Sequence, residues 1–390
     1  MASVPYDVVS TAEARALAAG NPLSFLHVSR AEIDLAPDTD PYADAVYRAA
    51  ADNLERLRVD VPFVVEDEAA LYFYRVADGS HEQTGLAGCF SLDEYDRDIV
   101  KRHERTRPDK EDDRTRHMLA VGAQTGVVFL AYRASPDVSA VKDRVCRESP
   151  LIDLTASDGV RHTLWRLNRR DRRAVVEAFG RVPCLYIADG HHRIASAARA
   201  RDELAAANDN NPAAEACFVL GVAFPDAETR ILPYNRAVAN LADLTPEAFL
   251  AAVGERLPVR ATGSPEPDKG YVSMYLGKRW YTVDLRAAAS AASGGVAAAL
   301  DVAVLQDHLL APLLGVADVR TDPRMIFVGG SRGTAELERL VDSGEAAVTF
   351  SMAAVTTDEL LRVSDAGEMM PPKSTWFEPK LRDGLLIHLI

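Results

Sequence analysis

The stretch Leu185–Arg193 constrains the fold of this chain more than any other. Four apolar or small residues, Leu-Tyr-Ile-Ala, end in the pair Asp189-Gly190, which is typical of a tight turn. Apolar groups then recur with the spacing of one helical face, at Ile194, Ala197, Ala198 and Leu204. The stretch therefore predicts a strand, a tight turn and a helix whose first turn carries His191, His192 and Arg193.

The first turn of such a helix has a chemical use. Its N–H groups have no partner within the helix, and it carries the positive end of the helix dipole, so it attracts anions. Arg193 can donate two parallel hydrogen bonds to a phosphate, and a histidine can take or give a proton near neutral pH. Asp189, just before the turn, can hold a metal ion or act as a base. The corner indicates an anion or phosphate site, with catalysis as a further hypothesis.

A purely structural explanation stays open for the same residues. Asp189 could cap the helix, and histidines in such turns are usually structural. His191 and His192 are not expected to ligate one metal ion together. Neighbours on a helix point about 100° apart, whereas zinc-binding pairs usually sit four residues apart on one face.

Composition narrows the class of protein. The 390 residues carry a net charge of −14, which argues against a general nucleic-acid binder, because neutralising phosphates needs a basic surface. The four cysteines are far apart and form no Cys-x-x-Cys pair, so we expect reduced thiols in a cytoplasmic protein. We recognise no signal peptide, and no stretch approaches the roughly 20 apolar residues of a membrane helix.

The order of elements predicts an α/β (α+β) protein with two lobes. Ser10 and Glu13 have the spacing of a capping box before an alanine-rich helix. Residues 23–29 predict a strand, and residues 44–57 predict a helix. The texture changes near residue 237, so we divide the chain into an N-terminal lobe of residues 1–236 and a smaller C-terminal lobe of residues 237–390.

Two polar stretches are candidates to complete a site around the corner. Residues 92–119 are crowded with charge, and most of these charges are expected to cover a solvated surface. The functional alternative is that the corner shares a cleft with His103, Glu104, Lys110 and Arg114. Residues 370–380, a polar run among prolines that includes Lys373, suit a loop folded over a site, although a structural crossover fits equally well.

Several motifs occur together in one order along the chain. They are Pro5–Ser10, His103-Glu104 with Lys110 and Asp113-Arg114, Tyr186–Arg193, Gly329–Gly333 and Met370–Lys380. With these motifs the chain resembles the prokaryotic family called domain of unknown function 1015. The Asp-Gly-His-His-Arg corner is in turn similar to the nucleotide corner of the ParB and sulfiredoxin superfamily, which includes free serine kinases. The resemblance implies a ParB/sulfiredoxin-like N-terminal lobe with a mixed sheet and a nucleotide-phosphate site.

The resemblance implies phosphoryl transfer from a nucleotide to a small hydroxyl metabolite such as free L-serine. The nucleotide would be ATP or ADP, or CTP as in ParB-like proteins. Such transfer needs positive charge around the phosphates, often with Mg²⁺. Two other classes stay open, a ParB-like nucleotide-binding regulator that contacts DNA and a phosphoserine-handling phosphatase. The acidic charge and the lack of a recognisable helix-turn-helix disfavour the DNA-binding class. The sequence does not decide the oligomeric state.

Roles for individual residues complete the hypothesis. We expect Asp189 to hold Mg²⁺, Glu104 to act as the general base, and His103 to be the next candidate for that base. The phosphates are expected to contact Gly190, His191, His192, Arg193, Lys110, Arg114 and Lys373.

Overall fold

The computed structural model describes residues 1–61, 63–207 and 209–390. The chain forms two compact units. The first unit contains residues 1–229 and 379–390, and the second contains residues 230–378. The chain thus leaves the first unit, forms the second, and returns to the first for its last residues, whereas the division expected from the sequence lies at 236/237 with no return.

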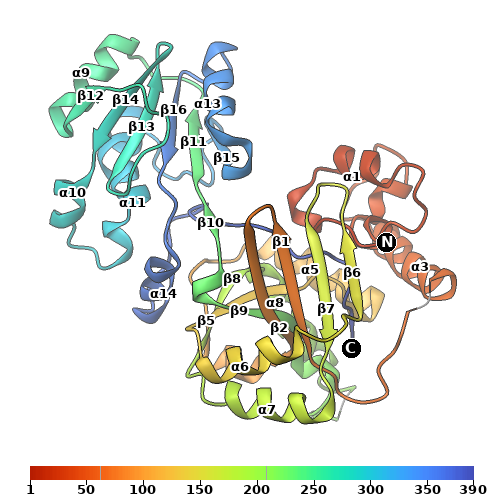
Figure 1. The fold of residues 1–390 in the computed structure, drawn as a ribbon. Helices are drawn as coiled ribbons and strands as arrows, with labels where there is room; N and C mark the ends of the chain where they lie inside the picture. The colour runs from red at the N-terminus through yellow and green to blue at the C-terminus, as the bar shows by residue number, and fades with distance from the viewer. Residues whose placement is uncertain (62, 208) are drawn as a thin grey trace. The chain divides into compact units, whose positions relative to one another are not determined.

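The first unit is built on a mixed eight-stranded sheet within the described residues (Figure 1). β3 and β8 are parallel, as are β5 and β9, and the remaining neighbours are antiparallel. In spatial order the strands are β3 Val100–Lys101, β8 Leu185–Asp189, β5 Val128–Tyr132, β9 Phe218–Pro225, β2 His81–Ser91, β1 Tyr72–Asp78, β7 Arg161–Arg166 and β6 Ile152–Thr155. The central strands β8 and β5 are almost wholly buried, which explains their continuous apolar sequence.

Helices pack against this sheet and share its apolar core. Figure 1 shows α6 and α7 side by side. The helices of this unit are α1 Thr11–Ala18, α2 Leu26–Ser29, α3 Asp44–Asp60, α4 Leu92–Asp96, α5 Pro108–Val121, α6 Pro136–Val145, α7 Arg169–Phe179 and α8 His191–Leu204, with short 3-10 turns at Tyr6–Val8, Ala31–Asp34, Glu215–Cys217 and Asp226–Glu228. The short strands β4 Ala123–Gln124 and β18 His388–Leu389 pair with each other.

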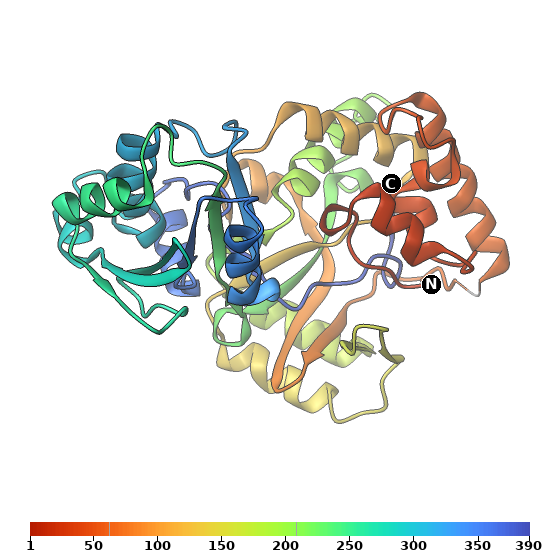
Figure 2. The ribbon, with the colours of Figure 1, turned by 90° about the horizontal axis from the view of Figure 1, so that it is seen from above.

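The two ends of the first unit's chain lie side by side. The N–H of Ser3 donates to the Asp383 carbonyl at 3.1 Å, and the N–H of Asp383 donates to the Ser3 carbonyl at 3.0 Å. Figure 2 shows the C-terminal segment passing beside the N-terminal one. Residues from both ends are thereby brought to one place in the unit.

The second unit has its own antiparallel six-stranded sheet and its own core within the described residues. In spatial order its strands are β12 Val259–Ala261, β14 Arg279–Asp284, β13 Tyr271–Leu276, β16 Val348–Met352, β11 Tyr234–Val238 and β15 Met325–Gly329, and β10 Ile231–Leu232 pairs separately with β17 Trp376–Phe377. Its helices are α9 Pro246–Arg256, α10 Arg286–Ala291, α11 Asp301–Leu305, α12 Ala311–Leu314, α13 Gly333–Asp342 and α14 Thr357–Asp365, with a π-helical turn at Gln306–Leu310 and 3-10 turns at Ala297–Ala299 and Gly330–Arg332.

The structure confirms a protein of mixed helices and sheets, and it confirms the capping box of Ser10 and Glu13. The strand predicted at residues 23–29 is wrong, because α2 forms there. Phe25 and Val28, three residues apart, pack into the same apolar cluster, which is the spacing of a helix rather than of a strand. Within the described residues we find no helix that is both long and apolar enough to cross a membrane.

Candidate functional site

The Asp-Gly-His-His-Arg stretch forms the predicted strand, turn and helix. β8 ends at Asp189, Gly190 is the N-cap, and α8 begins at His191. Gly190 has φ of 98°, a backbone conformation that side chains with a Cβ rarely adopt. A Cβ at this position would also lie 3.4 Å from the Cα of Val128 on the neighbouring strand. That distance is an ordinary van der Waals contact, so it is the positive φ that favours glycine between the strand and the helix.

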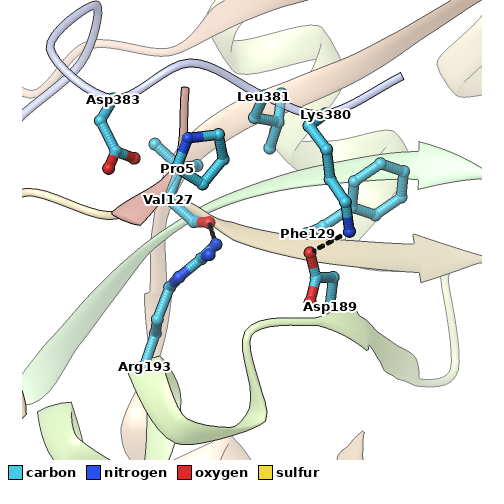
Figure 3. A pocket seen from close by; sticks show the side chains of 8 residues that line it. All are labelled: Pro5, Val127, Phe129, Asp189, Arg193, Lys380, Leu381 and Asp383. Carbon is cyan, nitrogen blue, oxygen red and sulfur yellow. Dashed lines mark hydrogen bonds and ion pairs between the residues drawn. The ribbon is translucent and has the colours of Figure 1, made fainter. Parts of the chain in front are cut away.

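The helix start opens on a small pocket of the first unit, here called the corner pocket. It is lined by Pro5, Val127, Phe129, Asp189, Arg193, Lys380, Leu381 and Asp383 (Figure 3). Lys380 donates to the Asp189 carboxylate at 2.8 Å. Asp189 therefore does not cap the helix, because its carboxylate is engaged by an ammonium group.

The charges around Asp189 fix its protonation. Burial acts to raise the pKa of this carboxyl, but Lys380 and Arg193 together bring the pKa below its ordinary value. The pKa of Lys380 is raised, since the attraction of Asp189 exceeds the opposing effect of burial. Asp189 and Lys380 are thus an ionised pair at neutral pH.

Arg193 is buried and occupied by groups of the protein. The side chain is 4 % exposed. One terminal nitrogen donates to the Val127 carbonyl at 2.7 Å, and the other donates to the Asp7 carboxylate at 2.7 and 2.8 Å. Its Nε has no hydrogen-bond partner among the described residues. Arg193 therefore anchors the N-terminal segment at the corner, in addition to any contact with a ligand.

Asp383 supplies a second carboxyl to the corner pocket. It is 2 % exposed, and its Oδ2 has no hydrogen-bond partner in the part of the chain that is described. Burial raises the pKa of Asp383 to about 7, with Arg193 acting in the opposite direction. This carboxyl changes its charge near neutral pH, whereas Asp189 beside it does not.

His103 and His191 meet edge to face, with their ring centres 4.4 Å apart. The backbone N–H of His103 donates to Nε2 of His191 at 3.4 Å, which is a long and weak hydrogen bond. Burial lowers the pKa of His103 to about 4 and lowers that of His191 well below its ordinary value. Both imidazoles are neutral at pH 7. Glu104 lies beside them, with one carboxylate oxygen within 4.8 Å of a ring nitrogen of each histidine.

Two further predicted residues, His192 of α8 and Lys110 of the charged stretch, make contacts of their own. His192 accepts a hydrogen bond at Nε2 from the backbone N–H of Arg107 at 3.0 Å. Lys110 donates to the Tyr42 hydroxyl at 2.7 Å. His192 therefore fixes the loop before α5, and Lys110 contacts a side chain outside the corner pocket.

Arg114 and Lys373, the remaining predicted phosphate-binding residues, lie in different units of the chain. Arg114 pairs with Asp113 at 2.8 Å, and its guanidinium lies 4.3 Å from the centre of the Tyr6 ring, next to Asp7 in the sequence. It is near enough to the corner pocket to lower the pKa of Asp383. Lys373 belongs to the second unit, where its Nζ lies 5.8 Å from the centre of the Tyr234 ring. Its role in phosphate binding stays a prediction.

Sequence reasoning assigned no role to Asp7, Lys380 or Asp383, which the structure brings to the corner. A signal existed for two of them. Asp7 lies in the motif Pro5–Ser10 and Lys380 ends the motif Met370–Lys380, so the motifs that mark the resemblance also contain these charges. Asp383 lies near an apolar C-terminal run, and nothing in its sequence neighbourhood points to the corner.

The chain belongs to the family described as protein of unknown function (DUF1015), whose model matches residues 1–303. No curated protein matches it significantly. The solved structures that are similar include a conserved hypothetical protein from Pyrococcus furiosus, at 14% identity and a TM-score of 0.37 over 76% of this chain and 93% of that one. A free serine kinase in complex with AMP is similar at 13% identity and a TM-score of 0.38, over 81% and 90% of the two chains. SbnI with a C-terminal truncation, from Staphylococcus aureus, is similar at 12% identity and a TM-score of 0.42, over 78% and 87%. We draw no conclusion on function from likenesses of this size.

Proposed function

We propose that the protein is a nucleotide-dependent phosphotransferase that acts on a small hydroxyl metabolite, with free L-serine as the first acceptor to test. One observation carries the proposal. The ion pair of Asp189 and Lys380 lies at the start of α8, in a pocket that also holds Arg193. A helix start with two cations suits an anionic phosphate. The resemblance of the corner to the ParB and sulfiredoxin superfamily points to the same ligand.

The residues fit a nucleotide that carries Mg²⁺. Mg²⁺ is usually held by one or two carboxylates together with phosphate oxygens and water. Asp189 offers an ionised carboxylate in the corner pocket, next to a lysine that can turn to phosphate instead. When bound, Mg²⁺ would neutralise charge that develops on the phosphates during transfer. In this proposal Asp189 holds the ion while Lys380 and the N–H groups of the first turn of α8 hold the phosphates.

The transfer itself needs a proton acceptor. The bond between the terminal phosphorus and its bridging oxygen breaks, and its electron pair leaves with the nucleotide. The acceptor oxygen forms the new bond to phosphorus and gives up its proton to a base. We assign the base to Glu104, because His103 is 1 % exposed and so is shielded from a dissolved acceptor. Gly190, His191, His192, Arg193, Lys110 and Arg114 remain the proposed phosphate-binding residues.

Binding is the first test. Calorimetry with ATP, ADP and CTP, each with Mg²⁺, should show saturable binding of at least one nucleotide. Lys380→Met should weaken that binding, since the substitution keeps the length of the side chain and removes its charge. Lys142→Met is the matched control, because Lys142 also pairs with a carboxylate of the first unit, that of Glu228, but does not line the corner pocket, and nucleotide binding should be unchanged there. No binding by the unaltered protein, or equal binding by Lys380→Met, would contradict the proposal.

Turnover is the second test. A panel of amino acids and other hydroxyl metabolites is incubated with the nucleotide that binds and Mg²⁺, and phosphorylated products are detected by mass. A product carrying the phosphate identifies the acceptor. If the protein binds a nucleotide and DNA but forms no phosphorylated product, a nucleotide-binding regulator would instead be favoured. Release of phosphate from phosphoserine without a nucleotide would favour a phosphatase. A cytoplasmic setting for the activity remains the expectation from the cysteine pattern.

A further inference from the structure

Among the described residues, His103, Glu104 and His191 form a group whose ligand atoms all lie within 4.8 Å of one another. His103 and Glu104 follow β3, and His191 opens α8, so two neighbouring parallel strands deliver them to one place. From these residues we infer a binding site for a divalent transition metal such as Zn²⁺, separate from the Mg²⁺ of the nucleotide. The inference goes beyond the proposed function and does not depend on it.

The state of His103 is an independent reason for the inference. The ring is 1 % exposed, and neither of its nitrogens makes a hydrogen bond of normal geometry among the described residues; the backbone of Ile187 comes near enough only to raise the pKa of the ring against the effect of burial. A buried polar atom without a partner costs free energy, and such atoms are rare in folded proteins. A metal ion between His103 and its neighbours would give one of these nitrogens a full bond, in place of the poorly aligned contact with the Ile187 backbone.

The geometry needs only a small adjustment. Bonds of about 2.0–2.1 Å in a tetrahedron place ligand atoms about 3.3 Å apart, so the three ligand atoms must approach from separations of up to 4.8 Å. Binding through His191 would also give up its 3.4 Å contact with the His103 N–H, which is too long to oppose a metal bond strongly. Rotation of the two rings and the carboxylate about their side-chain bonds would bring the three ligand atoms closer together.

The ligand set decides the type of metal. Two imidazoles and one carboxylate suit Zn²⁺, Co²⁺ and similar ions, whereas Mg²⁺ prefers oxygen ligands. Imidazole binds a metal in its neutral form, so binding should weaken at acid pH. Three protein ligands leave a position for water or a hydroxyl group. If the proposed function also holds, Glu104 would ligate the metal through one carboxylate oxygen and keep the other for the proton of the acceptor hydroxyl.

The test measures metal binding without nucleotide or turnover. The untagged full chain is freed of metal by a chelator and titrated with Zn²⁺ by calorimetry and with Co²⁺ by its visible absorption. We expect one equivalent to bind, with the intense absorption of four-coordinate Co²⁺, and an excess of Mg²⁺ should not displace it. Removing a residue that only hydrogen-bonds to a metal ligand typically costs about 10–100-fold in metal affinity. Because Glu104→Gln and His103→Gln remove the ligands themselves, each should weaken metal binding by about 100-fold or more.

His117→Gln is the matched control. His117 is also a buried histidine of the first unit, but it contacts the Val28 carbonyl at 2.9 Å and lies outside the group. Zn²⁺ binding by His117→Gln should equal that of the unaltered protein. Failure of the unaltered chain to bind a single equivalent would overturn the inference, as would equal binding by Glu104→Gln. Failure of nucleotide binding would overturn only the proposed function, because the Zn²⁺ titration contains no nucleotide.

Discussion

The carboxyl of Asp383 should make the first unit less stable as the pH rises. Burial raises its pKa from 3.8 to about 7, so the folded chain keeps this proton over a pH range in which the unfolded chain has lost it. The unfolded state then binds fewer protons than the folded state, and the free energy of unfolding falls with rising pH. The stabilisation is complete below about pH 4 and is lost as the pH rises through about 7.

The size of the effect follows from the two pKa values. A difference of about 3 between 3.8 and about 7 corresponds to about 4 kcal/mol. Asp383→Asn keeps the shape of the side chain and cannot ionise. Its free energy of unfolding should therefore vary less with pH, and near pH 8.5 it should exceed that of the unaltered protein by about 2–4 kcal/mol.

The measurement must report on the first unit alone, because a chain with two units need not unfold in one step. Replacing Trp280 and Trp376 of the second unit by Phe leaves Trp165, which is buried in the core of the first unit. Urea unfolding is then followed by the fluorescence of Trp165 at about pH 5.5 and at about pH 8.5. Asp153→Asn, which removes an exposed carboxylate paired with Arg161, is the control and should leave the pH dependence unchanged. If Asp383→Asn shows the same pH dependence as the unaltered protein, the carboxyl does not hold its proton and the reasoning fails.

Three further outcomes are expected. Gly190→Ala should destabilise the first unit by about 1–2 kcal/mol in urea unfolding, because φ is 98° there. Gly180→Ala, at φ of −62°, is the control and should change stability less. An equal loss in both variants would argue against backbone strain at position 190. Lys380→Met should destabilise the unit by about 1–3 kcal/mol, since Asp189 loses its partner, and the loss should shrink as the pH falls and the Asp189 carboxyl of the variant takes up a proton; a variant as stable as the parent at neutral pH would refute this. Under the proposed function, Glu104→Gln should lower turnover by about 10²-fold or more with nucleotide affinity nearly unchanged, and full turnover would rule out Glu104 as the base.

The sequence predicts the corner well because its signals are local. A buried strand, a glycine that tolerates φ of 98°, and a helical apolar spacing act over adjacent residues, and the structure has all three. The helix predicted at residues 44–57 is likewise present as α3. The segment 23–29 fails because a short apolar run suits a strand or a helix equally, and packing against α3 decides between them.

The surroundings of the corner could not be predicted in the same way. Asp7 reaches Arg193, and Lys380 reaches Asp189, across nearly half of the length of the chain. No periodicity connects residues so far apart, since their meeting depends on the order of strands and on the return of the chain at Pro379. The charges of Lys110 and Arg114 were visible in the sequence, but their contacts with Tyr42 and Asp113 were not.

The return of the chain at Pro379 bears on the order in which the protein can mature on the ribosome. Residues 1–229 are synthesised first, yet Lys380 and the rest of the segment that completes their unit come after the whole of the second unit. Until then Asp189 lacks the ammonium group of Lys380, and Ser3 lacks its backbone partner in Asp383. The nascent first unit therefore has only Arg193 to offset the Asp189 carboxylate at the start of α8, and the corner gains its final charge balance when the segment that follows the second unit has been translated.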